Sequence, residues 1–335
     1  MGYLVMIRQN RIQGLELKMK DLDTLSAYSS ENMLALKPLT DVICKEAPQT
    51  GIHLFHFSQS LCSMKVRQAL EENDVQWTSH HVLLPAYQQY EPDYVRMNPR
   101  CVVPTLVCDG KVTTDSANIL NFVMTKLSNS DISQKPSDHE FETIALWLNK
   151  ADSLPIEAFT YGDNRGTDKS FIFKKLANGG KDHEFKANLL RQLAKRYENE
   201  KQLFDAYESK LNIVETTLKI IQTPSRMNAL YDSADSILME LETQLLSGPF
   251  KESGWLASQE FSLADIVWGV VLYRLQKLGL EPILWSNKTT IGQYCEKLFA
   301  RESFKRGILD WSNVTKHAIL PMIKHKLFNR TNLNS

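Results

Sequence analysis

The chain divides into a stretch of short apolar runs, residues 51–127, and a stretch of helical periodicity that begins near residue 138. In the first stretch, Ile52 to Phe57 is an apolar and aromatic run typical of a strand, and Met64 to Leu70 has helical composition. Further strands are expected at residues 77–83, 102–108 and 111–114, and a further helix at 117–127. Because the turn Asp109-Gly110 joins the last two strands as a hairpin, this order predicts a small α/β domain with a mixed sheet.

The second stretch predicts helices almost throughout. They are expected at residues 140–152, 186–221, 233–246, 262–278, 291–300 and 318–327. Glycines gather between the first two of these helices, so residues 160–181 are interpreted as an inserted loop. The predicted organisation is an N-terminal extension over residues 1–50, the α/β domain over 51–127 and an all-helical domain over 138–330.

Composition narrows the class of protein without identifying it. Lys plus Arg and Asp plus Glu are equal at 39 each, so charge favours neither nucleic acid nor an anionic membrane as a partner. No apolar run reaches the length of a transmembrane helix. The five cysteines are few and odd in number, which argues against a disulfide framework and for a reducing compartment. We therefore expect a cytoplasmic protein, while the basic residues within 1–50 leave mitochondrial targeting open.

Cys62 lies in the loop of small hydroxyl residues between the first strand and the first helix. A thiol at such a turn faces unpaired backbone N–H groups and the positive end of a helix dipole, and both stabilise the reactive thiolate. The alternative is that Cys62 is a packed, small apolar residue, as most free cysteines are. The local sequence leaves both interpretations open.

Two further positions have the chemistry of a peptide-binding site. Pro104 follows two valines in a predicted strand, which places it at a sheet edge, a strand start or a cis bond. A cis bond there would turn backbone N–H and C=O groups toward an extended peptide. Asp115 and Ser116 begin a helix, where they cap it and have the groups to hold a zwitterionic amino-acid end.

Histidines do not form a metal-ligand pattern in this chain. His53 and His56 lie on one strand without a second pair at ligand spacing, and the adjacent His80 and His81 point to opposite faces of theirs. We expect no metal site.

The order and spacing of these signals resemble the glutathione transferase superfamily. A thiol at the first strand–helix turn, a Val-Pro strand and an Asp-Ser helix start precede an all-helical domain. Within the superfamily the chain is similar to tetrachlorohydroquinone reductive dehalogenase-like enzymes. The matching segments are Ser60-Leu61-Cys62-Ser63-Met64-Lys65, Glu91-Pro92-Asp93-Tyr94-Val95-Arg96 and Val102-Val103-Pro104-Thr105-Leu106-Val107. The resemblance implies a thioredoxin-like N-terminal domain followed by an all-helical C-terminal domain.

The segment Gly254 to Ile266 resembles the superfamily's helix-capping motif. Ser262 is expected as the N-cap and Asp265 as its reciprocal partner in a capping box. Phe261 and Ile266 are expected to form the hydrophobic staple. The motif serves folding, so it supports the fold and not the chemistry.

The resemblance also implies roles for the residues of the site. Cys62 would match the essential thiol of the dehalogenase, and Ser60 would donate a hydrogen bond to the glutathione thiolate. Since no second cysteine follows at Cys-x-x-Cys spacing, a monothiol cycle that uses external glutathione is expected.

Glutathione itself would be held by residues of the α/β domain. Val103, before cis-Pro104, would pair with the cysteinyl unit, and Asp115 and Ser116 would hold the γ-glutamyl group. The anchor of the glycyl carboxylate is unassigned, with Arg96 and Arg100 as candidates. Trp147, Asp152 and Phe159 are candidates to line the second-substrate pocket, with a place in the core as the equal alternative.

These observations lead to two classes of function. The first is a glutathione-dependent transferase or reductive dehalogenase that acts on a halogenated or quinone-like aromatic, with a thiol transferase as a close variant. Its partners would be glutathione as co-substrate and a small electrophile, and a homodimer is a further expectation from the family. The second is a non-catalytic interaction or redox-sensing module similar to the ganglioside-induced differentiation-associated proteins.

Overall fold

The computed structural model describes residues 47–127, 137–162, 165–166, 178, 180–252 and 254–321. They all belong to one compact unit, Thr40–Ser335. The predicted extension over residues 1–50 lies outside the described residues except for its last four positions. Most of the predicted loop over 160–181 and of the connection before residue 138 also lies outside them. The domain boundaries therefore stay predictions.

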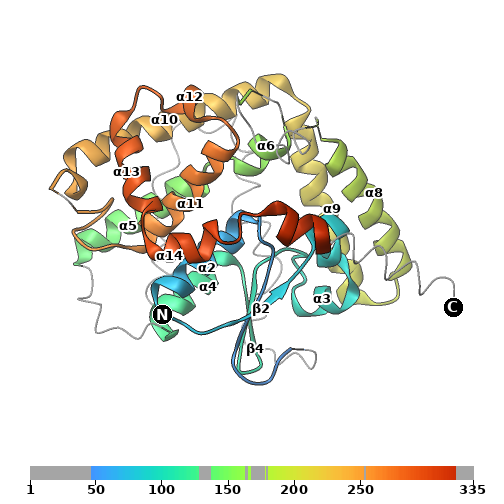
Figure 1. Cartoon of the computed structure of the whole chain (residues 1–335). Coiled ribbons are helices and arrows are strands. Elements are labelled where there is room, and N and C mark those ends of the chain that lie inside the picture. The colour runs from blue at the N-terminus through green and yellow to red at the C-terminus, as the bar shows by residue number, and fades with distance from the viewer. Residues whose placement is uncertain are drawn as a thin grey trace. The chain divides into compact units, whose positions relative to one another are not determined.

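A four-stranded mixed sheet forms the centre of the N-terminal part (Figure 1). Its strands are β1 (Ile52–His56), β2 (Thr78–His81), β3 (Thr105–Cys108) and β4 (Lys111–Thr114), in the order β2-β1-β3-β4. β1 and β2 are parallel, whereas β1 with β3 and β3 with β4 are antiparallel. The mixed sheet and the hairpin after Cys108 confirm the expected strand order.

The helices of this part are α2 (Leu61–Glu72), α3 (Pro92–Met97) and α4 (Ser116–Phe122), with the short 3-10 helices η2 (Leu84–Ala86) and η3 (Gln88–Tyr90) and the π-helix η4 (Val123–Leu127). α2 packs against α4. On α3, Tyr94 and Met97 pack with Val107 and Val112 of the sheet in one apolar cluster. This arrangement of strands and helices is the thioredoxin-like fold that the resemblance implied.

The rest of the described chain is helical, as predicted. Its elements are α5 (Asp138–Asp152), α6 (Ile156–Tyr161), α8 (Lys181–Arg196), α9 (Lys201–Ile221), α10 (Pro224–Ser247), η5 (Pro249–Glu252), α11 (Leu263–Lys277), α12 (Glu281–Leu284), α13 (Thr289–Phe299), α14 (Glu302–Phe304), η6 (Lys305–Leu309) and η7 (Thr315–Ile319). No helix in this described part, or in the N-terminal one, is long and apolar enough to cross a membrane.

The prediction of one helix over residues 186–221 was wrong. Two helices, α8 and α9, pack against each other as a hairpin, with a turn from Tyr197 to Glu200 between them. The turn follows from the polar run Glu198-Asn199-Glu200, because asparagine favours turns over helix interiors.

Helix α11 links the two parts of the molecule, because it packs against both α5 and α2. All its residues from Ala264 to Leu275 are buried. The predicted capping box is confirmed: the Asp265 carboxylate accepts hydrogen bonds from Ser262 N (2.8 Å) and Ser262 Oγ (2.7 Å). It also accepts hydrogen bonds from Leu256 N and Tyr294 Oη. Phe261 packs edge-on against Trp255, so the staple with Ile266 stays a prediction.

Candidate active site

The turn between β1 and α2 brings Ser60 and Cys62 together. Ser60 is the N-cap of α2, and its Oγ accepts a hydrogen bond from Ser63 N at 3.3 Å. Cys62 is the second residue of the helix, half-buried and free of a disulfide. The helix thus begins earlier than the sequence suggested, and the thiol lies within its first turn, where the helix dipole favours negative charge.

Helix α11 holds this turn from the helical domain. Arg274 donates a hydrogen bond to Gln59 O, next to the Ser60 cap. Burial lowers the pKa of Arg274 to about 10, and negative charge on Tyr161 or Cys62 acts to raise it. At this end of α2, Arg274 therefore places a positive charge close enough to Cys62 to act on it.

A second buried arginine supports the turn from inside α2. Arg67 is fully buried and donates to Phe57 O (3.2 Å), Ser58 O (3.0 Å) and Gly307 O (2.7 Å). Burial lowers the pKa of Arg67 to about 9. A side chain at Gly307 would meet Gln68 N at 2.8 Å, so glycine is needed for η6 to approach α2 this closely.

Lys65 lies one helical turn after Cys62 and is also buried. Its Nζ is 3.3 Å from Asp152 Oδ1 of α5. Burial acts to lower the pKa of Lys65, but Asp152 and Cys62 outweigh it, so that the pKa of Lys65 is raised. Lys65 is therefore a buried cation that connects the two domains beside the thiol.

The Val103–Pro104 peptide bond is cis, and β3 begins directly after it at Thr105. The preceding loop is held at the Val102 carbonyl, which accepts hydrogen bonds from Tyr94 Oη (2.7 Å) and Asn98 Nδ2 (2.8 Å). Of the alternatives that the sequence left open for Pro104, the structure thus shows both a strand start and a cis bond.

Asp115 is the cap of α4, and Ser116 is the first residue of that helix. The Asp115 side chain accepts a hydrogen bond from Ala117 N at 2.9 Å and forms an ion pair with Arg100. Asp115 has a φ of +74°.

The other arginine proposed as a carboxylate anchor is Arg96. It forms ion pairs with Asp93 (2.7 Å) and Glu200 (3.1 Å). Both candidate anchors therefore already contact protein carboxylates.

Two of the expected pocket residues are core residues. Trp147 is buried against Trp268, and Phe159 is buried against Tyr231. Asp152 differs, because its side chain is 54% exposed while it contacts Lys65. Among the described residues no group of three or more His, Cys, Asp or Glu side chains is placed to hold a metal ion.

Sequence reasoning missed Arg67, Arg274 and the role of Lys65. The available signal was a basic residue inside a buried helical stretch: Arg67 follows Val66, and Arg274 lies between Tyr273 and Leu275. Buried cations are rare unless they are paired, so such a position indicates a specific partner.

Comparison with known proteins agrees with this architecture. The family model described as glutathione S-transferase, N-terminal domain, matches residues 59–126. The tetrachloro-p-hydroquinone reductive dehalogenase of Sphingobium chlorophenolicum is 30% identical over 266 residues, which cover 76% of this chain and 94% of that protein. The 2,5-dichlorohydroquinone reductive dechlorinase of Sphingobium indicum is 29% identical, covering 77% of this chain and 82% of that one.

A structural comparison supports the fold alone. The beta-etherase LigF from Sphingobium sp. strain SYK-6 matches with a TM-score of 0.55 at 19% identity, covering 77% of this chain and 98% of that one.

The chain belongs to the glutathione transferase superfamily and is an enzyme of the glutathione transferase type. The family resemblance and the fold class expected from the sequence are confirmed.

Proposed function

We propose that this protein is a glutathione-dependent reductive dehalogenase of halogenated or quinone-like aromatics, in which Cys62 is the catalytic thiol. One observation carries the proposal: Cys62 lies in the first turn of α2, two residues after the Ser60 cap and close to the buried Lys65. A relative that is named a reductive dehalogenase and is 30% identical supports the type of reaction.

The chain's other described cysteines are poorer nucleophiles. Burial raises the pKa of the Cys101 and Cys295 thiols to about 12. Burial, together with Asp109, also raises the pKa of Cys108. Because the thiolate is the form that attacks, these environments argue against Cys101, Cys108 and Cys295 as the nucleophile.

Glutathione would lie along the edge defined by the α2 and α4 N-termini. The Val103 backbone before cis-Pro104 would pair with its cysteinyl unit, and Asp115 and Ser116 would hold its γ-glutamyl end. Arg100 forms an ion pair with Asp115 and would orient the Asp115 carboxylate. The Ser60 hydroxyl would donate a hydrogen bond to the glutathione thiolate and so lower its pKa.

The reaction would run in three steps. Glutathione thiolate forms a carbon–sulfur bond to the ring, and the halogen leaves as halide. The Cys62 thiolate then attacks the glutathionyl sulfur; the carbon–sulfur bond breaks, its electron pair stays on the ring carbon, and that carbon takes a proton. A second glutathione thiolate attacks the mixed disulfide and releases oxidised glutathione, which regenerates Cys62.

The test compares wild type with Cys62→Ser and, as a matched control, Cys108→Ser. With a chlorinated hydroquinone and glutathione, wild type and the control should release chloride, reduced phenol and oxidised glutathione. Cys62→Ser should release chloride but accumulate the aryl–glutathione conjugate, because its second step is blocked. A wild-type protein that neither binds glutathione-agarose nor turns over a halogenated quinol or a disulfide would instead favour the non-catalytic alternative.

A further inference from the structure

The chain between β1 and the first turn of α2 contains both Ser60 and Cys62. We call it the Cys62 turn, residues 57–62. Arg67 donates hydrogen bonds to its first two carbonyl groups, and Arg274 donates to the third. Arginines of α2 and α11 therefore hold the acceptor groups of this turn.

A donor group of the turn is also bound by a distant side chain. Ser58 is fully buried, and its backbone N–H donates to Nε2 of His81 at 3.1 Å. His81 is the last residue of β2 and lies opposite His56 of β1. A buried N–H that loses its acceptor costs the full free energy of its desolvation, so this hydrogen bond fixes the orientation of the Ser58 peptide.

The hydrogen bond also defines the protonation of His81. Because Nε2 accepts, the neutral ring carries its proton on Nδ1. The groups that face the ring are His56 of β1, Arg67 of α2 and His317 of η7. Burial, and then His317 and Arg67, lower the pKa of His81 to about 4. At neutral pH the imidazole is therefore an acceptor and not a cation.

Aromatic rings hold His81 in this position. Its ring lies 5.3 Å from that of Phe57, and it stacks on Trp311 with the centroids 6.4 Å apart and 17° between the planes. Trp311 is itself connected to the turn, because its carbonyl accepts a hydrogen bond from Gln59 Nε2 at 3.2 Å. Packing thus fixes the ring of His81, which is what a side chain needs in order to orient another group.

We propose that His81 is a positioning residue of the active site, which fixes the Cys62 turn through Ser58 and so directs the Ser60 hydroxyl toward the glutathione thiolate. The inference rests on the proposed function, because that function gives Ser60 its role. Ser58 and Ser60 belong to one tight turn, closed by a hydrogen bond from Ser60 N to Phe57 O at 3.1 Å. A change in the Ser58 peptide therefore displaces the Ser60 side chain, and a small displacement of such a group is costly to the rate.

The test compares two substitutions that each keep one property of the imidazole. His81→Phe keeps a ring that can stack on Trp311 but has no acceptor, whereas His81→Gln keeps an acceptor oxygen at about the same reach but has no ring. The matched control is His80→Phe, because His80 points to the opposite face of β2 and contacts His53 at 2.9 Å. Thermal melting of each variant measures its folding.

The readout is the pKa of the thiol of bound glutathione, measured from the absorbance of the thiolate as the pH is varied. His81→Phe should raise this pKa by about half a unit or more, which slows conjugation near neutral pH about threefold or more. His81→Gln and His80→Phe should keep the wild-type value. In a Ser60→Gly background, which has already lost the hydroxyl, His81→Phe should cause no further change, because it acts through Ser60.

Two results overturn the inference: equal pKa values in His81→Phe and His81→Gln, or a further change caused by His81→Phe in the Ser60→Gly background. If wild type does not bind glutathione, the proposed function fails, and hydrogen exchange at the Ser58 amide then decides the role of His81. Faster exchange in His81→Phe than in wild type and His81→Gln supports His81 as the residue that fixes the turn. Equal exchange in all three proteins overturns it.

Discussion

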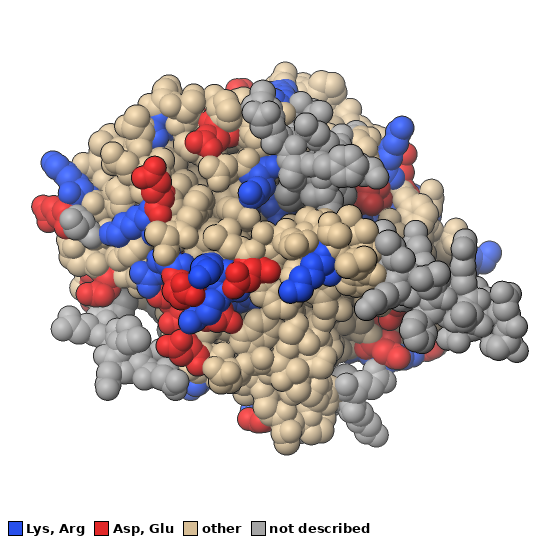
Figure 2. All heavy atoms as spheres, in the orientation of Figure 1, with Lys and Arg blue, Asp and Glu red and all other residues tan. Residues whose placement is uncertain are grey.

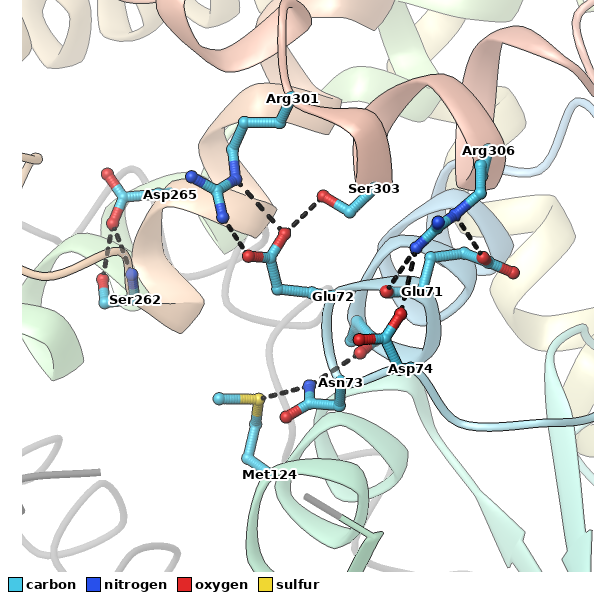
Figure 3. Close-up of polar contacts among 11 residues, drawn as sticks. Glu71, Glu72, Asn73, Asp74, Met124, Ser262, Asp265, Arg301, Ser303 and Arg306 are labelled. Carbon is cyan, nitrogen blue, oxygen red and sulfur yellow. Dashed lines mark hydrogen bonds and ion pairs between the residues drawn. The ribbon is translucent and has the colours of Figure 1, made fainter. Parts of the chain in front are cut away.

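The two ends of helix α2 are both surrounded by charged side chains, yet the charges are arranged differently. At its C-terminal end, Glu72 accepts hydrogen bonds from Arg301 Nε at 3.2 Å and from Ser303 Oγ (Figure 3). Arg306 pairs with Glu71 at 2.9 Å and with Asp74 at 3.3 Å. These contacts attach α2 to α14 and η6, and they form a closed set in which each acid meets a cation.

Figure 2 shows the surface over this end of α2, where basic and acidic side chains lie next to one another. At the Cys62 end, by contrast, the buried cations Lys65 and Arg274 lie close enough to the thiol to interact with it. Charges that pair with one another hold two segments together, whereas cations beside a thiol favour its reactive thiolate form. Together with the proposed role of Cys62, the comparison predicts that one end of α2 contributes stability and the other contributes chemistry.

The shape of the surface alone would suggest that the reaction takes place at the C-terminal end of α2. A hollow of about 410 Å³ lies at the C-terminal end, lined by Glu71, Asp74 and Arg306 together with Trp77 and Trp311. Its charged groups are already paired, and Cys62 does not line it. Under the proposed function, the location of the thiol is the better guide to the reacting end.

The largest predicted effect is on activity, which should depend on the Cys62 end of α2 and not on the Glu72 end. Cys62→Ser is expected to lower kcat for the reduced phenol about a thousandfold, equivalent to ~4 kcal/mol in the barrier, because the thiolate forms and breaks bonds. Its urea midpoint should stay that of wild type, since the residue is only half-buried. Steady-state kinetics and urea unfolding measure both quantities. A loss of activity in Glu72→Gln as large as in Cys62→Ser would contradict the division between the ends.

The next effect should separate them by stability. Glu72→Ala is expected to lower the free energy of unfolding by about 2–3 kcal/mol, because Arg301 and Ser303 lose their shared acceptor in a partly buried contact. The turnover number under native conditions should not change. The control is Glu302→Ala, whose side chain is 62% exposed and 3.8 Å from Lys305, and which should lose less than about 0.5 kcal/mol. Equal losses in the two variants would show that the network contributes no more than ordinary surface charge.

Whether a contact could be predicted from the sequence depends on how far apart its residues are in the chain. The Asp109-Gly110 hairpin and the Ser262–Asp265 capping box depend on residues at most three apart, and both are present. The buried cations depend on partners far away in the chain. Lys65 and Asp152 are 87 positions apart, and Arg67 and Gly307 are 240 apart. A basic residue in a helix predicts a solvated face until its distant partner is known.

The same limit applies to the candidate site, where local features could be predicted and contacts between distant residues could not. The chemical types at Cys62, Pro104 and Asp115 were visible in the sequence, because each occupies a local turn or helix start. The position of Arg274 beside the Cys62 turn was not visible, since it depends on how α11 packs against α2.

A smaller effect concerns pH and tests the support beneath the Cys62 turn. His56 is fully buried; its Nδ1 lies 3.1 Å from Arg67 Nη1 and its Nε2 2.8 Å from Ser79 Oγ. Burial, and then Arg67, lower the pKa of His56 from 6.5 to about 2. The unfolded chain binds a proton below pH 6.5 that the folded chain does not, so stability falls as pH falls from 7 to 5. This histidine alone should lose about 2 kcal/mol over that range.

Urea unfolding at both pH values measures this loss. His56→Gln should show a smaller pH dependence than wild type, whereas the exposed His139→Gln should keep the wild-type dependence. A pH dependence that is the same in all three proteins would mean that His56 titrates normally in the fold. Burial lowers the pKa of His81 as well, to about 4, so some dependence should remain in His56→Gln.

The smallest effect bears on Ser60, the one residue that belongs to both sides of the comparison, because it caps α2 and is proposed to hydrogen-bond the glutathione thiolate. Ser60→Ala should destabilise the protein by about 1 kcal/mol, whereas Ser60→Gly should lose only a few tenths, because glycine is tolerated at an N-cap. Both variants remove the hydroxyl, so both should raise the pKa of bound glutathione by about one unit and slow conjugation near neutral pH about tenfold. The pH profile of conjugation, read beside the urea midpoint, separates the two roles. If Ser60→Gly conjugates at the wild-type rate while Ser60→Ala does not, the hydroxyl acts only as a cap, and the chemistry at this end of α2 rests on Cys62 and the cations beside it.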